Sequence, residues 1–282
     1  MTSPAPSVTS RITRCFEELR RKGELGIVTF ITAGDPSLEA TERFVLALAD
    51  AGADLIELGV PFSDPIADGP TIQRSSERAL RAGTSLHSVL SLVSHLREKT
   101  EAPLVLFSYF NPVLQMGLEK FASESASAAV DGVLITDLTT EEGSDYRMIL
   151  HAKGVETIFL ASPTTNDDRL KLIAEASSGF LYLISRTGVT GAKDTLPEDL
   201  PALIRRARAV TSLPLAVGFG ISLPGHVSIL GGLADAAVVG SALVSEIERA
   251  TSIGRASQAI SERVRSLKQA ASRGLSRREG QP

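Results

Sequence analysis

The sequence has no tryptophan, one cysteine and few aromatic residues. It holds 3 tyrosines and 10 phenylalanines in 282 residues, which disfavours the aromatic platforms on which nucleic-acid bases stack. The net charge is −4, so we expect no basic surface for nucleic acid or an anionic membrane. Cys15 cannot form an internal disulfide. Its helical spacing with neighbouring apolar residues indicates a buried structural thiol in a reducing compartment.

Long apolar runs are also lacking. No run approaches the roughly eighteen residues that a membrane span needs. The first ten residues, MTSPAPSVTS, have neither the basic start nor the apolar centre of a signal peptide. The four histidines are not at metal-ligand spacing, so no metal site is predicted. We therefore expect a cytoplasmic protein with neither a membrane nor a nucleic-acid partner.

What the sequence does contain is a rhythm of apolar, β-branched runs. They are continuous rather than alternating, which is typical of strands covered on both faces. Segments of helical period separate them, for example Leu38–Ala51 and Leu86–Leu96. The eight runs are Gly26–Thr32, Asp54–Leu58, Pro103–Tyr109, Gly132–Asp137, Thr157–Ala161, Phe180–Ser185, Leu215–Phe219 and Ala236–Val239.

Eight strand–helix units predict a single (β/α)8 TIM barrel of α/β class, in preference to an open doubly wound sheet. An extra helix should begin at Ser10 and end near Gly23, ahead of the first strand. A weak internal repeat places an aspartate before three of the strands, at Asp54, Asp131 and Asp235. We expect the barrel to span residues 10–270, with a disordered arm at 1–9 and a flexible basic tail at 271–282.

Two glycine-rich motifs follow the last two strands, where phosphate-binding barrels hold their anion. They are GFGIS at 218–222 and GSA at 240–242. The simpler interpretation is that the glycines make tight turns and the serines cap helices. Both motifs at these two strand ends favour a phosphate site. The loop RTGVTG at 186–191 lacks the P-loop pattern, and it is either a lid over the site or a flexible surface loop.

The stretch Glu57–Pro70 carries three carboxylates and three prolines but no lysine or arginine. Glu57 ends an apolar strand, so it is either a paired structural acid or a general acid–base with a raised pKa. No cation lies near it in sequence, which favours the second interpretation. Asp68 lies in a loop that could bend over the barrel mouth, whereas Asp64 could face outward.

Five segments together resemble one family. The sequence resembles the tryptophan synthase alpha subunit from about Phe16 to about Leu267. The segments that carry the resemblance are ELGVPFSDPIADGPTIQ, FITAGDP, YLISRTGVTG, VGFGIS and VVGSALV. The resemblance implies a phosphate-binding TIM barrel. It also implies a lyase that cleaves indole-3-glycerol phosphate to indole and glyceraldehyde 3-phosphate by a retro-aldol reaction.

The resemblance also implies roles for individual residues. Glu57 matches the general acid–base, and Asp68 matches the acid that accepts the indole N–H. Thr190 matches a lid threonine, next to Gly191. Gly220, Gly240 and Ser241 match phosphate contacts. The remaining substrate-binding candidates line the mouth or the indole pocket: Phe30, Thr32, Tyr109, Leu134, Tyr182 and Phe219.

A partner is implied as well. The family works with a pyridoxal-phosphate beta subunit in an α2β2 heterotetramer, so this chain itself needs no cofactor. Pro61, Asp64 and Asn111 match interface positions. After the fourth strand the sequence departs from the family, because Asp137 is not closely followed by proline. Two other hypotheses are a stand-alone lyase that releases indole and a non-catalytic barrel; the intact acids and phosphate motifs argue against the latter.

Overall fold

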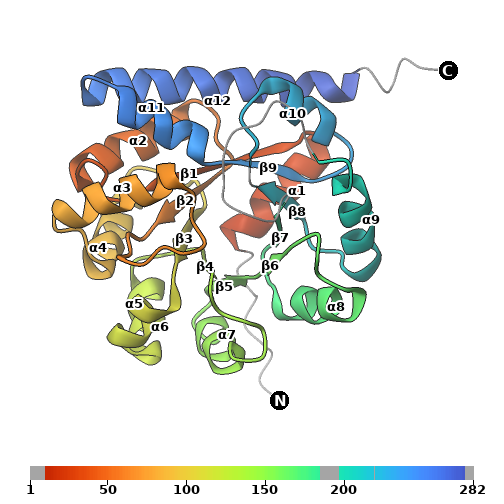
Figure 1. Ribbon diagram of the computed structural model, residues 1–282, viewed down its shortest axis with the longest axis horizontal. Coiled ribbons are helices and arrows are strands. Elements are labelled where there is room, and N and C mark those ends of the chain that lie inside the picture. Colours follow the sequence, from red (N-terminus) through yellow and green to blue (C-terminus); the bar gives the residue numbers. More distant parts are fainter. Residues whose placement is uncertain (1–9, 185–196, 219, 277–282) are drawn as a thin grey trace.

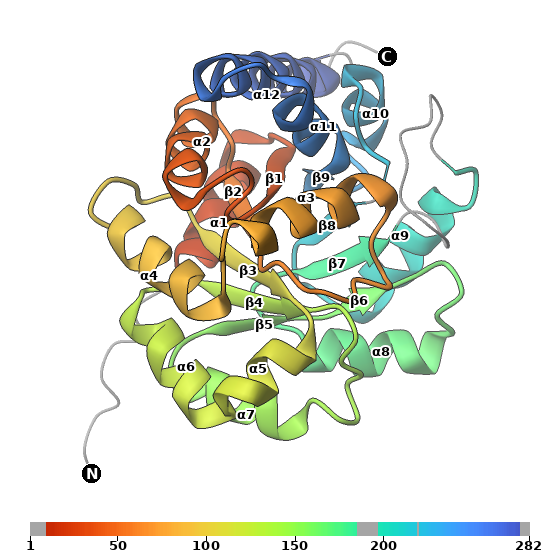
Figure 2. The same cartoon turned by 60° about the vertical axis from the view of Figure 1, so that its left-hand side comes forward.

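The computed structural model describes residues 10–184, 197–218 and 220–276, which form a barrel of parallel strands surrounded by helices (Figures 1 and 2). The strands follow the order β5-β4-β3-β2-β1-β9-β8-β7-β6 around the sheet. Their bounds are β1 Gly26–Thr32, β2 Leu55–Gly59, β3 Leu104–Ser108, β4 Gly132–Ile135, β5 Glu156–Ile158, β6 Leu160–Ala161, β7 Leu181–Ile184, β8 Leu215–Gly218 and β9 Ala236–Val239.

The predicted fifth strand is divided in two. β5 pairs with β4, whereas β6 pairs with β7. Phe159 lies between them, and its carbonyl accepts the Tyr182 N–H at 3.3 Å. β5 and β6 are consecutive in the chain and together correspond to the predicted fifth strand. They join the two ends of the hydrogen-bonded sheet, so the eight strand–helix units form a closed ring. The predicted (β/α)8 barrel is therefore confirmed.

Helices surround the strands. Their bounds are α1 Arg11–Lys22, α2 Leu38–Asp50, α3 Pro70–Arg81, α4 Leu86–Leu96, α5 Phe110–Met116, α6 Leu118–Ser127, α7 Ser144–His151, α8 Asp167–Ala176, α9 Leu200–Val210, α10 Pro224–Leu230, α11 Ser241–Arg249 and α12 Ile253–Ser276. Within the described ranges, no helix combines the length and the apolar character that crossing a bilayer requires.

The last helix, α12, lies along one side of the barrel beside α2, α10 and α11 (Figures 1 and 2). It continues to Ser276, so the boundary predicted at residue 270 falls inside a helix. Ala270 and Ala271 are buried there, which explains why the helix extends into a stretch that reads as polar and basic. The predicted arm at 1–9 lies outside the described residues, as do residues 277–282 of the predicted tail.

The N-terminal helix α1 closes the bottom of the barrel. The Ser10 side chain accepts the Thr13 N–H at its start, and Gly23 ends it in a left-handed conformation. Its buried face carries Ile12, Phe16 and Leu19, which belong to the same apolar cluster as the inward-facing strand residues. The extra helix predicted from the sequence is confirmed, and it covers the end of the barrel opposite the carboxyl ends of the strands.

Strand residues alternate between two apolar clusters. In β1, Val28 and Phe30 belong to the cluster inside the barrel, whereas Ile27 and Ile31 belong to the layer between strands and helices. This is the two-residue period of a strand. In β2 the inner residue is Leu55. Glu57, two positions on, therefore faces the barrel interior.

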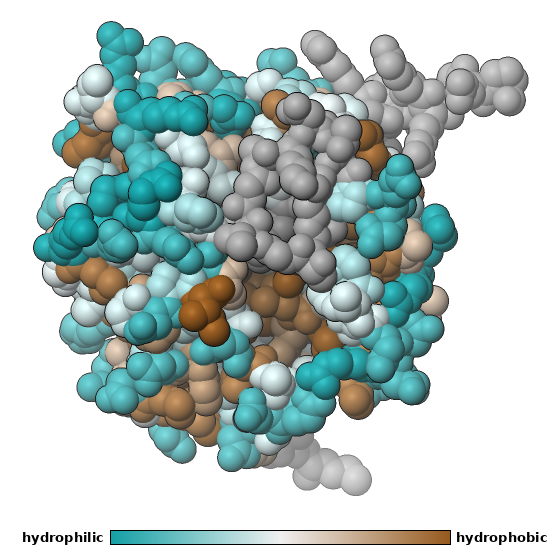
Figure 3. All heavy atoms as spheres, in the orientation of Figure 1, coloured by the Kyte–Doolittle hydropathy of each residue, from teal (hydrophilic) through white to brown (hydrophobic). Residues whose placement is uncertain are grey.

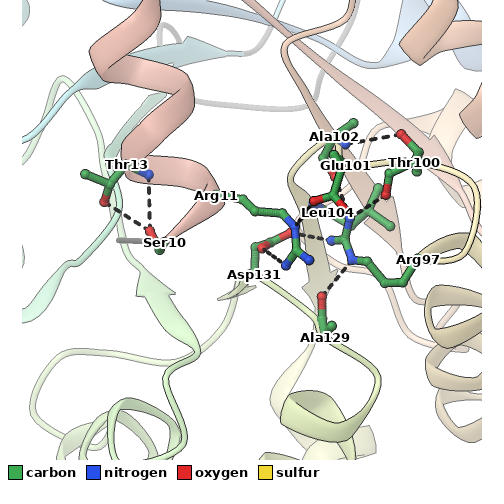
Figure 4. Close-up of polar contacts among 10 residues, drawn as sticks. All are labelled: Ser10, Arg11, Thr13, Arg97, Thr100, Glu101, Ala102, Leu104, Ala129 and Asp131. Atoms are coloured by element: carbon green, nitrogen blue, oxygen red, sulfur yellow. Dashed lines mark hydrogen bonds and ion pairs between the residues drawn. The ribbon is translucent and has the colours of Figure 1, made fainter. Parts of the chain in front are cut away.

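The aspartates of the internal repeat share one structural role. Asp54, Asp131 and Asp235 each precede a strand, and each accepts the backbone N–H of a residue in the neighbouring strand at 2.6–2.7 Å. Each carboxylate also meets a basic side chain, supplied by Lys268, Arg97 and Arg208 respectively. Figure 4 shows Asp131 between Arg11, Arg97 and Leu104.

Ser178 takes the same position in the remaining quarter of the barrel, where its hydroxyl accepts the Thr157 N–H at 2.9 Å. Side-chain acceptors ahead of β2, β4, β7 and β9 thus each accept a backbone N–H of the preceding strand unit at the bottom of the barrel. Cys15 lies at this end, and its thiol donates to the Asp54 carbonyl at 3.2 Å. Burial raises the pKa of the Cys15 thiol to about 12, so the thiol is protonated and unreactive at neutral pH.

Candidate active site

A pocket opens where the carboxyl ends of the strands meet. It holds about 480 Å³ of empty space, with the open solvent at its mouth included. In Figure 3, apolar side chains gather near the centre of the face and hydrophilic ones surround them. The lining residues are Phe30, Glu57, Asp68, Ile72, Phe107, Tyr182, Gly220, Val238, Gly240 and Ser241.

Glu57 is fully buried and is the middle residue of β2, which continues to Gly59. In the parallel register it lies between Phe30 of β1 and Val105 of β3. Neither carboxyl oxygen has a hydrogen-bond partner among the described residues. Burial alone raises the pKa of Glu57 to about 8. A carboxyl group that is protonated at neutral pH and aimed into a pocket can donate a proton, and this fits the predicted general acid–base.

Asp68 is held in a different environment. The Tyr109 hydroxyl donates to its carboxylate at 3.1 Å and accepts the Ala67 N–H at 3.0 Å. The Gln73 side chain donates to the Asp68 carbonyl at 2.9 Å. Burial raises the pKa of Asp68 to about 6, and the Tyr109 hydrogen bond opposes that rise. At neutral pH the pocket therefore holds one protonated and one ionised carboxyl group, an arrangement suited to acid–base chemistry.

Aromatic rings form the apolar part of the pocket. Phe107 lies edge-on to Phe30, with ring centroids 5.2 Å apart, and 6.5 Å from Tyr182. Gly218 at the end of β8 makes room for Tyr182, because a Cβ atom there would lie 2.2 Å from the tyrosine oxygen. This wall suits a flat aromatic group placed beside the two acids.

The part of the pocket that follows β8 and β9 suits an anion. Gly240 precedes α11 and Ser241 is its first residue, and the first turn of this helix carries no acidic side chain. Backbone N–H groups at a helix start bind phosphate well. Gly220 has φ +90°, a conformation that favours glycine. Ser222 is buried, and its N–H donates to the His226 Nδ1 at 3.3 Å, so its backbone is engaged within the loop.

Most predicted site residues in the described ranges meet in this pocket, but three have other surroundings. Thr32 bonds Ser75 of α3 at 2.6 Å, and Leu134 is wholly buried in the barrel interior. Neither side chain lines the pocket in this structure, so their substrate contacts stay predictions. The Tyr109 hydroxyl bonds Asp68. Thr190, Gly191 and Phe219 lie outside the described residues.

Sequence reasoning missed three lining residues. Phe107 and Val238 lie two positions after inward-facing Val105 and Ala236, so strand alternation carried a signal for both. Ile72 lies in the first turn of α3, and only the path of the preceding loop brings it to the pocket. In the part of the chain that the structure describes, no cluster of three or more histidine, cysteine or acidic side chains could hold a metal.

The predicted interface residues differ in exposure. Asp64 and Asn111 are exposed, whereas Pro61 is buried within the chain. Two apolar side chains that the sequence did not single out are exposed in the same segments. They are Ile66, with 87% of its surface exposed, and Leu114 of α5, with 52%. Exposed apolar groups beside a site often mark a protein interface.

Comparisons with known proteins agree on one family. The sequence model of the family described as tryptophan synthase alpha chain matches residues 16–272. The tryptophan synthase alpha chain of Solibacter usitatus is 52% identical over 240 residues, covering 85% of this chain and 90% of that protein. The one from Geobacter sp. (strain M21) is 51% identical with the same coverage.

Solved structures give the same result. Tryptophan synthase from Mycobacterium tuberculosis matches with a TM-score of 0.85 at 32% identity, over 93% of this chain and 98% of that one. The tryptophan synthase α2β2 complex from Pyrococcus furiosus matches with a TM-score of 0.81 at 41% identity, over 87% of this chain and 97% of that one. The chain belongs to the tryptophan synthase alpha chain family.

Proposed function

We propose that the pocket between Glu57 and Asp68 cleaves indole-3-glycerol phosphate to indole and glyceraldehyde 3-phosphate, the lyase reaction of this family. The observation that carries the proposal is that two carboxyl groups in different surroundings line one pocket. Glu57 has no hydrogen-bond partner among the described residues, whereas Asp68 accepts the Tyr109 hydroxyl. Burial raises the pKa of Glu57 to about 8, while that of Asp68 is about 6. At a pH between these two values, Glu57 is protonated and can donate a proton, whereas Asp68 is ionised and can stabilise positive charge.

Glu57 moves the protons. Indole leaves easily only after its C3 atom is protonated, and protonated Glu57 supplies that proton. The Glu57 carboxylate then takes the proton of the side-chain hydroxyl. The electron pair of that O–H bond forms the aldehyde, and the electrons of the breaking carbon–carbon bond return to the ring. The atoms and charges balance, and Glu57 ends protonated as it began.

Asp68 and the glycine wall hold the substrate. The ionised Asp68 accepts the indole N–H and stabilises the positive charge that develops on the ring. The aromatic wall around Phe107 and Tyr182 receives the indole. The phosphate binds at Gly220, Gly240 and Ser241, where backbone dipoles of α11 offset its charge. These placements rest on the pocket lining, which contains all six of these residues.

We further infer that the chain works with a beta subunit in an α2β2 complex, as the Pyrococcus furiosus relative does. Pyridoxal phosphate would belong to that subunit, and the alpha reaction would need neither this cofactor nor a metal. Exposed Ile66 and Leu114, next to exposed Asp64 and Asn111, support an interface at the mouth of the barrel. Indole formed at the pocket would leave toward this surface.

Indole release from indole-3-glycerol phosphate by the purified full-length chain tests the proposal. We expect slow release by the chain alone, undiminished by a chelator, and strong activation by a tryptophan synthase beta subunit. Fast release without activation would favour a stand-alone lyase. No release in either condition would favour a non-catalytic barrel and overturn the proposal.

A further inference from the structure

The helix after Asp68 and the helix at the phosphate wall lie side by side (Figures 1 and 2). α3 begins at Pro70, two residues after Asp68, and Gln73 in its first turn donates to the Asp68 carbonyl. α11 begins at Ser241. Any shift between these helices therefore changes the position of the acid relative to the anion-binding wall.

Glu248 of α11 fastens the two helices together. Its carboxylate accepts two hydrogen bonds from Arg74 of α3, both at 2.8 Å, and a third from Arg78 at 2.8 Å. These hydrogen bonds lower the pKa of Glu248 to about 2, so the carboxylate stays ionised throughout the working range of an enzyme. The geometry is the paired fork that arginine forms with carboxylates.

Arg78 extends this connection to the barrel. Its guanidinium also donates two hydrogen bonds to Asp35, both at 2.8 Å. Asp35 follows β1 and has only 2% of its side chain exposed. The arginine thus joins a buried carboxylate of the barrel to the partly exposed Glu248. A network of this kind holds its members more firmly than isolated surface pairs do.

We propose that Glu248 is a positioning residue, which holds Asp68 in register with the phosphate wall by fixing α3 against α11. It does not line the pocket, and it acts through Arg74, Arg78 and the start of α3. The proposal rests on the proposed lyase function. A small misplacement of a catalytic group lowers the rate of the chemical step much more than it weakens substrate binding.

Glu248→Gln tests the proposal in the full-length chain, with Glu77→Gln as the matched control. Glu77 also pairs with an arginine, Arg81, at 3.3 Å, but both partners are exposed on α3. We expect Glu248→Gln to lower kcat by about tenfold. KM for indole-3-glycerol phosphate and the inhibition constant of glycerol 3-phosphate should stay within about twofold of their wild-type values. Glu77→Gln should match wild type.

Arg74→Gln provides a second test, because Arg74 is about half exposed and its side chain bonds Glu248 alone among the described residues. Its kcat should fall by a smaller factor, with the same unchanged inhibition constant. The proposal is overturned if Glu248→Gln leaves kcat unchanged, or if it weakens glycerol 3-phosphate binding as much as it lowers kcat. Absence of cleavage by the wild-type chain, both alone and with a beta subunit, would instead refute the proposed function.

Discussion

The two acids predict a bell-shaped dependence of kcat on pH. The productive pocket holds protonated Glu57 and ionised Asp68. The pKa of Asp68 is about 6, so kcat should fall as the pH drops below this value and the carboxylate gains a proton. The pKa of Glu57 is about 8, so kcat should fall again above it as Glu57 loses its proton. The plateau lies between the two.

The magnitude follows from these values. At pH 7 about nine-tenths of Asp68 is ionised and about nine-tenths of Glu57 is protonated, given pKa values of about 6 and about 8. Two units away, at pH 5 or pH 9, only about one-tenth of the limiting acid has the required form. We therefore expect kcat to be about eight- to tenfold lower at either extreme than at pH 7.

Initial rates of indole release at saturating substrate, in buffers of constant ionic strength, give this profile. The substrate phosphate itself titrates near pH 6, so Tyr109→Phe is the decisive variant. It removes the hydrogen bond that lowers the pKa of Asp68, and the acidic limb should move to higher pH while the basic limb stays in place. If the acidic limb does not move, the titration of Asp68 is not what causes it.

Three further predictions, which use four substitutions, test the energetics of the fold. Between pH 4.5 and about 8, Glu57 ionises in the unfolded chain but not in the folded one, so the wild type loses stability as the pH rises. The free energy of unfolding of Glu57→Gln should therefore increase relative to wild type by up to about 1.4 kcal/mol per pH unit in this range. A difference between the two proteins in urea denaturation that does not change with pH would contradict the raised pKa of Glu57. Gly218→Ala should lower the free energy of unfolding by about 1–3 kcal/mol and raise KM, because the added Cβ would displace Tyr182. An unchanged midpoint of urea denaturation and an unchanged KM would contradict this prediction. Asp131→Ala should lower the free energy of unfolding by about 3–5 kcal/mol, because Arg97 and the Leu104 N–H are left without their partner. Ser178→Ala should lower it by only about 1 kcal/mol. Equal losses for the two variants in urea denaturation would contradict this difference.

Periodic features of the fold could be predicted from the sequence. Continuous apolar runs located the strands to within two residues at most ends, and Ala236–Val239 has the bounds expected. The division at Phe159 could not be predicted, because it depends on β5 and β6 bonding to different neighbours. The helix Pro70–Arg81 was also missed, since its buried face is small and its proline reads as part of the preceding loop.

The candidate site divides in the same way. The two acids and the glycine motifs could be predicted because catalytic groups concentrate at the strand ends of barrels. Alternation alone left open which face of β2 is inside, and the apolar cluster around Leu55 assigns Glu57 to the interior. The hydrogen bond between Thr32 and Ser75, 43 positions on, could not be predicted, because a sequence does not show which distant hydroxyl groups meet.

The account depends most on Glu57 as the group that moves protons. Glu57→Gln keeps the shape of a side chain that is fully buried but can neither donate nor accept the proton. Single-turnover release of indole from indole-3-glycerol phosphate, with glycerol 3-phosphate inhibition measured alongside, tests this most directly. We predict a rate lower by about 10² to 10⁴-fold with the inhibition constant unchanged. A rate within about threefold of wild type would contradict the assignment.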